Sequence, residues 1–138
     1  MTVRDIARRD VVSVGPEATV QEIAELLRTE SVGSVVVAED DRPVGVVTDR
    51  DIGVGIWEHE DPTAVTAADL MTTDPVTVEI DEGIYDALQV ARGANVRRLP
   101  VVEDGRLVGI VTLDDFLVLL AGELDVVSDV IQSKSPAY

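Results

Sequence analysis

The sequence predicts an α+β fold built from two copies of one β-α-β-β-α unit. Residues 12–52 align without a gap with residues 76–116, and 13 of the 41 aligned positions are identical. Within each copy the hydrophobic pattern changes in the same order, from alternating to helical, then to continuous apolar runs, then to helical again. A repeat of this kind indicates that one supersecondary unit is used twice and that the two copies bury each other's apolar faces.

Each unit is expected to start with a short strand followed by an amphipathic helix. The strands are Val12-Ser13-Val14 and Val76-Thr77-Val78, where apolar and polar residues alternate. The segment Thr19-Val20-Gln21-Glu22 is a capping box, which opens a helix. Apolar residues at helical spacing predict the buried helix faces, which are Val20, Ile23, Ala24 and Leu27 in the first copy and Ile84, Ala87, Leu88 and Ala91 in the second.

Two runs rich in β-branched residues follow in each copy and predict a buried hairpin. In the first copy the runs 35–37 and 44–47 flank the turn Asp40-Asp41-Arg42-Pro43. In the second copy the runs 99–102 and 108–111 are joined through Asp104-Gly105.

A Thr-x-x-Asp sequence after each hairpin opens another helix, and a short helix is expected before each unit, over 3–9 and over 67–71. We therefore divide the chain into a first domain at 1–57, a linker at 58–66, a second domain at 67–122, and a C-terminal helix and tail at 123–138. The linker is polar, and its His59 is expected to be a solvated loop residue because no second histidine or cysteine could complete a metal site.

A stripe of apolar residues continues past the second unit and predicts a terminal helix to about residue 132. Its members are Leu117, Leu120, Leu124, Val127 and Ile131. The stripe is typical of ordinary packing inside a molecule, and an exposed portion of it would favour a dimer.

The composition excludes several classes of function. The chain has no cysteine, which rules out disulfides and thiolate chemistry. Its 27 acidic and 11 basic residues give a net charge of −16, which repels nucleic acids and anionic membranes. Such a surface suits a salt-rich cytosol, with an ordinary acidic protein as the alternative. Because no apolar run is long enough to span a membrane and the start is unlike a signal peptide, we expect a cytoplasmic protein.

Two matched copies of Gly-hydrophobic-Val-Thr-x-x-Asp, at 45–51 and 109–115, resemble a pair of cystathionine beta-synthase (CBS) domains, also called a Bateman module. The stretch Asp69-Leu70-Met71-Thr72-x-Asp74-Pro75-Val76 and the run Arg98-Leu99-Pro100-Val101-Val102 share the style of that family. The resemblance covers the chain from Thr2 to about Leu120. It implies a pseudo-two-fold disc in which the sheets of the two units pack together and leave two clefts, where relatives bind adenosine-containing ligands.

The resemblance also implies which residues contact a ligand. The last acid of each motif, Asp51 or Asp115, would hold the ribose diol, because an ionised carboxylate can accept hydrogen bonds from both hydroxyls. The threonines Thr48 and Thr112 would contact phosphate or ribose at helix N-termini, where free N–H groups favour an anion.

The resemblance places basic and apolar contacts as well. Arg50 lies inside the first motif, and Arg97 and Arg98 match a basic pair that faces phosphate in kinase-regulatory members of the family. Val12 and Val76, at the starts of the first strands, would flank the base.

Each of these residues has a structural alternative. The Thr-x-x-Asp pairs also satisfy a helix-capping pattern, and Thr66-x-x-Asp69 shows the same spacing outside the motif. The arginines could pair with surface acids, and the two valines could belong to the core. The copies differ, because Gly33-Ser34 stands opposite Arg97-Arg98 and Arg50 stands opposite Asp114, so the two clefts should not be equivalent.

The leading functional hypothesis is a regulatory sensor that binds AMP, ADP or ATP, with S-adenosylmethionine and NAD ranked behind them, and that requires no cofactor or metal. The alternative is a protein–protein interaction or dimerisation module with vestigial clefts. No nucleophile motif, paired histidines or Walker-type loop supports an enzyme. A homodimer and an unidentified regulated protein are the expected partners, with neither nucleic acid nor membrane among them.

Overall fold

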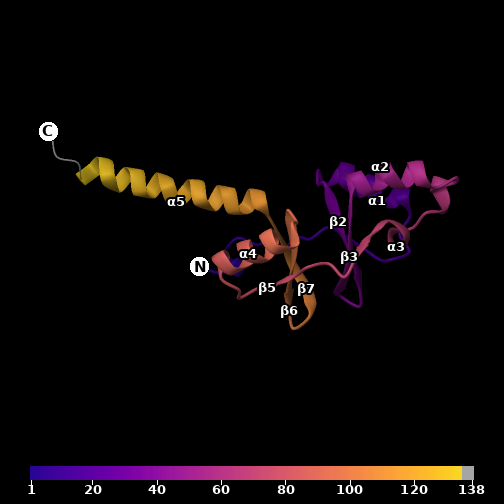
Figure 1. Ribbon diagram of the computed structural model, residues 1–138, viewed down its shortest axis with the longest axis horizontal. Coiled ribbons are helices and arrows are strands. Elements are labelled where there is room, and N and C mark those ends of the chain that lie inside the picture. The colour runs from indigo at the N-terminus through magenta and orange to yellow at the C-terminus, as the bar shows by residue number, and fades with distance from the viewer. Residues whose placement is uncertain (135–138) are drawn as a thin grey trace.

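The computed structural model describes residues 1–134 and contains the two repeated units in the predicted order (Figure 1). The first unit comprises β1 (Ser13–Val14), α1 (Val20–Thr29), β2 (Ser34–Glu39), β3 (Arg42–Thr48) and α2 (Asp49–Glu58). The second comprises β5 (Val78–Glu79), α4 (Ile84–Ala94), β6 (Arg98–Glu103), β7 (Arg106–Thr112) and α5 (Leu113–Lys134). The remaining short elements are η1 (Val3–Asp5), η2 (Pro62–Ala64), α3 (Ala67–Leu70) and β4 (Thr72–Thr73). The predicted α+β class is confirmed. Of the C-terminal helix and tail predicted at 123–138, the part beyond residue 134 lies outside the described residues.

The strands form two sheets, in the orders β1-β2-β3-β4 and β5-β6-β7. In each sheet the first strand runs parallel to the second, and the second and third strands form an antiparallel hairpin. Positive φ values at Asp40 and Asp41, and at Asp104 and Gly105, turn the two hairpins. Two successive left-handed residues match the twist of the flanking strands, which explains why short acidic residues and glycine occupy these turns.

Each sheet packs against helices, and a separate apolar core lies between them. The first core centres on Ile23 and the buried valines of β2 and β3, and the second on Leu99, Ala87 and Phe116. The predicted face of α4 is confirmed, since its members are buried or pack against the second core. In α1 the prediction was wrong at one position, because Ala24 is exposed and Leu26 packs against the core instead.

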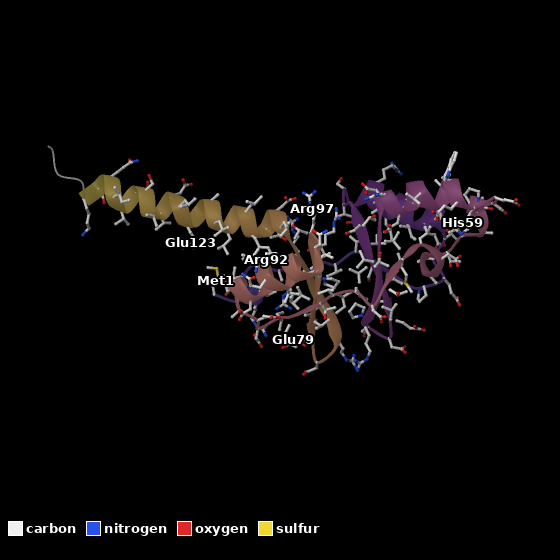
Figure 2. All side chains as sticks on the ribbon, viewed as in Figure 1. Met1, His59, Glu79, Arg92, Arg97 and Glu123 are labelled. Carbon is white, nitrogen blue, oxygen red and sulfur yellow. The ribbon has the colours of Figure 1, made fainter. Side chains whose placement is uncertain are left out.

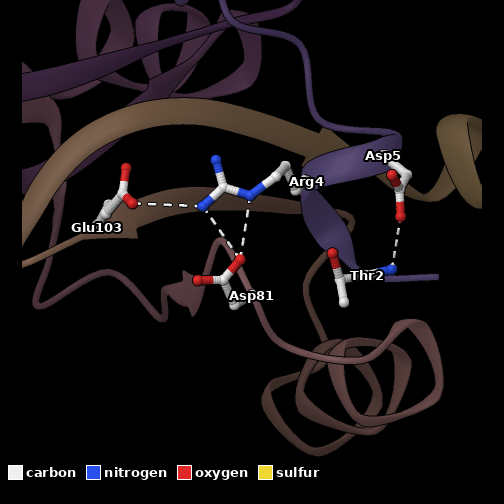
Figure 3. Close-up of polar contacts among 5 residues, drawn as sticks. All are labelled: Thr2, Arg4, Asp5, Asp81 and Glu103. Carbon is white, nitrogen blue, oxygen red and sulfur yellow. Dashed lines mark hydrogen bonds and ion pairs between the residues drawn. The ribbon is translucent and has the colours of Figure 1, made fainter.

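The segment before each unit packs against the other unit. Val3 is buried in the second core, and the amides of Val3 and Arg4 donate to the carbonyl oxygens of Glu82 and Ile80. The Arg4 guanidinium bridges Asp81 and Glu103, and these pairs raise the pKa of Arg4 (Figure 3). In the same way Ala67 joins the first core. The exchange ties the two units together and brings β3 against β7.

The motif glycines permit this exchange. A side chain at Gly109 would put its Cβ 2.9 Å from the carbonyl oxygen of Arg8, which pairs with β7 through Ile110. At the equivalent Gly45, a Cβ would collide with the side chain of Met71. Glycine inside a strand is typical of such close approaches by another segment.

We expect Gly109→Ala to lower the free energy of unfolding by about 1–3 kcal/mol, because a backbone atom cannot move aside as a flexible side chain can. Denaturant unfolding would measure the change. The control is Gly93→Ala in α4, where a Cβ meets nothing within 4 Å, and this change should leave stability equal or slightly higher. Equal stability of the Gly109→Ala protein and the wild type would contradict the role assigned to this glycine.

The C-terminal helix is longer than predicted, because the helix opened by the second Thr-x-x-Asp and the terminal helix are one element, α5. Only its start packs on the body, through Leu113 and the buried Phe116. The rest extends away from both units (Figure 1), and every residue from 121 to 134 is exposed. Across residues 1–134, no helix combines the length and apolar character needed to cross a membrane.

Candidate functional site

A cleft of about 340 Å³ opens between the two units. The first unit contributes the end of β3 and the start of α2, the connecting segment contributes β4 and the residues after it, and the second unit contributes the end of α4 and the start of β6. The lining residues are Val46, Thr48, Asp51, Thr72, Asp74, Pro75, Val76, Ala94, Val96, Arg97, Arg98 and Pro100. The cleft thus combines an apolar wall with two carboxylates, two hydroxyls and two guanidinium groups.

Asp51 caps α2 and still presents an oxygen atom that the cap does not use. Its Oδ2 accepts a hydrogen bond of 2.9 Å from the Thr48 amide, and the Thr48 hydroxyl accepts one of 3.1 Å from the Asp51 amide. No donor within residues 1–134 contacts the other oxygen, Oδ1. The cap fixes the orientation of the carboxylate, so capping and ligand binding are compatible at this residue.

Arg97 and Arg98 stand at the junction of the two units, and Figure 2 shows Arg97 close to where α5 leaves the body. Gly33 leaves space for Arg98, since a Cβ at Gly33 would lie 3.0 Å from the Arg98 Nη2 atom. A smaller cavity of about 170 Å³ adjoins both arginines and is lined further by Thr112, Leu113 and Asp114. The two arginines therefore reach both cavities, and they concentrate positive charge in a chain whose net charge is −16.

Asp115 occupies a different environment from Asp51. Its Oδ2 accepts from the Thr112 amide at 2.9 Å and from the Thr112 hydroxyl at 3.1 Å, while Oδ1 accepts from the Arg8 Nε atom at 3.1 Å. The Asp115 side chain is only 10% exposed. Arg8 is the counterpart of Thr72 by the 64-residue offset, so the exchanged N-terminal segment covers this carboxylate with a cation.

Of the residues predicted for the site, the cleft brings together Thr48, Asp51, Val76, Arg97 and Arg98. Thr112 lies in the adjoining cavity, Asp115 is paired with Arg8, and Val12 packs against the first core. Arg50 is exposed in the first turn of α2 and does not line the cleft. The structure thus agrees with the expectation that the two halves differ.

The sequence analysis missed several residues of the cleft wall. Thr72, Asp74 and Pro75 belong to a stretch that carried the resemblance but was assigned no role. The apolar residues Val46, Ala94, Val96 and Pro100 complete the wall. Val96 matches an identical residue, Val32, at the 64-residue offset, and this identity could have indicated a site residue. Such identities are, however, also typical of core positions.

A cap of the same type outside the cleft shows that the Thr-x-x-Asp pattern alone does not make a site. The Asp69 carboxylate accepts from the Thr66 amide at 2.9 Å and from the Thr66 hydroxyl at 3.1 Å, and these hydrogen bonds lower the pKa of Asp69. Asp69 is exposed at α3 and does not line the cleft. His59 is exposed at the end of α2, far from the junction (Figure 2). Within the described residues, no three His, Asp or Glu side chains are grouped to hold a metal.

Comparison with known proteins gives a family match over both units. The chain matches the CBS domain family at residues 3–52 and again at residues 67–122. It is 39% identical over 120 residues to the uncharacterized protein MK0525 of Methanopyrus kandleri, which covers 85% of this chain. The chain spans 61% of the length of that relative.

Two solved structures with adenosine ligands have the same fold. The structure of CBSX2 in complex with AMP aligns with a TM-score of 0.77 and 29% identity, covering 88% of this chain and 97% of that one. The CBS domain pair of protein MJ0100, in complex with 5′-methylthioadenosine and S-adenosyl-L-methionine, aligns with a TM-score of 0.80 and 25% identity. It covers 89% of this chain and 98% of that one.

Proposed function

Because this chain belongs to the CBS domain family, we propose that it is a regulatory sensor that binds an adenine nucleotide in the cleft between its two units. The observation that carries the proposal is the presence of one oriented carboxylate, two arginines and an apolar wall in a single cleft. AMP, ADP and ATP are the leading ligands. The role is one of binding, not catalysis, and needs no further cofactor.

The cleft offers a distinct surface for each part of a nucleotide. The base would lie against the wall formed by Val46, Val76 and Val96, since ligand pockets hold flat apolar groups between aliphatic side chains. The Asp51 Oδ1 atom would accept hydrogen bonds from the ribose diol. Bonds to a charged acceptor are worth roughly 1.5–3 kcal/mol, which makes Asp51 a principal source of affinity.

The phosphate groups would lie toward Arg97 and Arg98. Guanidinium groups bind phosphate oxygens in a bidentate manner and keep their charge at all relevant pH values. The same two cations disfavour the sulfonium of S-adenosylmethionine, so nucleotides with phosphate rank ahead of it here.

We further propose that each chain binds one nucleotide. Asp115 already has partners on both carboxylate oxygens, with Arg8 on Oδ1 and Thr112 on Oδ2. A ribose at that position would have to displace the Arg8 guanidinium. The Arg8–Asp115 ion pair therefore favours binding of the nucleotide in the cleft at Asp51.

Isothermal titration calorimetry with AMP, ADP, ATP, adenosine, S-adenosylmethionine and NAD tests this function. The titrations should be run at low and at high salt, because the charge of −16 repels anionic ligands when it is unscreened. We expect binding of at least one adenine nucleotide with a stoichiometry near one per chain. Absence of any binding heat across the whole series at both salt concentrations would contradict the proposal.

A second candidate is an interaction module whose clefts bind nothing. The observation in its favour is the exposed apolar side of α5, where Leu117 and Leu124 are 63% and 69% exposed. An interaction through α5 is compatible with nucleotide binding, but empty clefts are not, so the titrations decide between the two candidates.

A further inference from the structure

The register of the strands shows which residues lie at each end of the cleft. Strand β4 is antiparallel to β3, with Thr73 opposite Gly45, so the chain moves away from the end of β3 as it continues to Asp74. This register places Asp74 beside Val44, and the two residues border one cavity. At the usual rise of a strand, Val44 lies about 13 Å along β3 from Thr48. Asp74 and Thr48 both line the cleft, so they mark its two ends.

The two cleft arginines lie at the opposite end from Asp74. Gly33, which directly precedes β2, adjoins the Arg98 guanidinium, and the start of β2 pairs with the end of β3 at Thr48. Asp74 instead borders a second cavity, together with Gly105 in the turn of the second hairpin. The cleft therefore carries its guanidinium groups at one end and the Asp74 carboxylate at the other.

The Asp74 carboxylate is available to accept hydrogen bonds. Asp74 is exposed, and no donor within residues 1–134 contacts either of its carboxylate oxygens. Arg42 and Glu79 border the same second cavity. The Arg42 guanidinium adjoins Gly105, and no ion pair joins it to Asp74. Because an ionised carboxylate only accepts hydrogen bonds, this end of the cleft favours a ligand group that donates them.

The edge of adenine matches this end of the cleft. Adenine carries a 6-amino group that donates hydrogen bonds, whereas a 6-oxopurine such as guanine presents an oxygen atom that only accepts them. A carboxylate therefore attracts the first and repels the second. With the phosphate at the arginines and the ribose at Asp51, a base lying along Val46 and Val76 would point its far edge toward Asp74.

From this arrangement we propose that Asp74 determines the base specificity of the cleft, by accepting a hydrogen bond from the 6-amino group of adenine and excluding 6-oxopurines. The inference rests on the proposed function, because it concerns the nucleotide bound in the same cleft. Cytosine also carries an amino group that donates hydrogen bonds. Its single ring covers less of the apolar wall than a purine does, so CMP should bind more weakly than AMP.

Isothermal titration calorimetry with AMP and IMP tests this specificity, because IMP has a 6-oxo group in place of the 6-amino group. The wild type should bind AMP about 10- to 100-fold more tightly than IMP. Asp74→Asn should lower this ratio by about tenfold or more, because an amide can turn either its oxygen or its NH₂ group toward the base. Asparagine also tolerates the φ of 49° at this position, so the variant should keep the fold.

Asp10→Asn is the matched control. The AMP-to-IMP ratio is the informative quantity, because Asp74→Asn also removes a negative charge and should strengthen the binding of both anionic nucleotides alike. Asp10 is the counterpart of Asp74 at the 64-residue offset, is exposed and does not line the cleft. Its substitution makes the same change in charge and should leave the ratio at the wild-type value.

The titrations separate base specificity from nucleotide binding. Equal affinities of the wild type for AMP and IMP would overturn the base specificity and leave nucleotide binding in place. A preference for AMP that Asp74→Asn leaves unchanged would overturn the role of Asp74. If the wild type binds neither nucleotide, the proposed function fails, and the inference fails with it.

Discussion

Asp51→Ala is expected to weaken AMP binding by about 10- to 100-fold, which corresponds to the loss of one charged hydrogen-bond pair. The reason is geometric: Thr48 holds one carboxylate oxygen of Asp51 at 2.9 Å, and the other is available to both hydroxyls of a ribose. Titration of wild type and variant with AMP measures the loss. A companion titration with 2′-deoxy-AMP should show a smaller effect of the substitution, because one of the two hydroxyls is already missing.

The Thr66-x-x-Asp69 cap provides the matched control for this substitution. Asp69→Ala removes a cap of the same type at α3, with a carboxylate that does not line the cleft. Both variants should lose a similar amount of stability, roughly 0.5–2 kcal/mol for a helix cap, while only Asp51→Ala loses nucleotide affinity. Equal AMP affinity in wild type and Asp51→Ala would mean that the carboxylate serves the helix alone.

The second large effect is expected at the arginine pair. Replacing both Arg97 and Arg98 with Gln should weaken AMP binding by about 10- to 100-fold and leave adenosine binding nearly unchanged, because adenosine carries no phosphate. Comparing the two ligands separates the loss of a phosphate contact from a general distortion of the cleft. Added salt should also reduce the difference in AMP affinity between the wild type and the double variant, because it screens the attraction between the guanidinium groups and the phosphate.

Arg106→Gln is the control for the change in net charge. Arg106 is exposed at the start of β7, pairs with Asp41 at 3.5 Å and does not line the cleft. Arg106→Gln changes the net charge outside the cleft and should alter AMP affinity far less than the change at Arg97 and Arg98. An equal loss for AMP and adenosine in the double variant would remove the phosphate role of these residues.

The local structure of this chain was predictable because short-range chemistry determines it. The hairpins follow from β-branched runs around residues that tolerate positive φ, and Thr19, Thr48 and Thr112 begin helices where capping patterns occur. Because the two copies share one pattern, each predicted element was supported by two segments of the sequence. The error at Ala24 arose because its neighbour Leu26 also lies near the apolar face of α1, and only tertiary packing decides which of the two is covered.

The sequence analysis predicted a difference between the clefts but missed one of its physical causes. It traced the difference to Gly33-Ser34 opposite Arg97-Arg98 and to Arg50 opposite Asp114. In the structure the Arg8–Asp115 ion pair also separates the two halves. That pair joins residues 107 positions apart and depends on the exchange of N-terminal segments, which no local pattern encodes. Similarly, Pro75 and Thr72 reach the cleft only because β4 pairs with β3.

A crystal structure of the chain with AMP is the most direct test of the central claim, that the cleft at Asp51 holds an adenine nucleotide. The account predicts one AMP per chain, with its ribose hydroxyls within hydrogen-bond distance of the Asp51 carboxylate, its phosphate toward Arg97 and Arg98, and the Arg8–Asp115 pair intact. AMP bound at Asp115 with Arg8 displaced, or bound with its ribose turned away from Asp51, would contradict it.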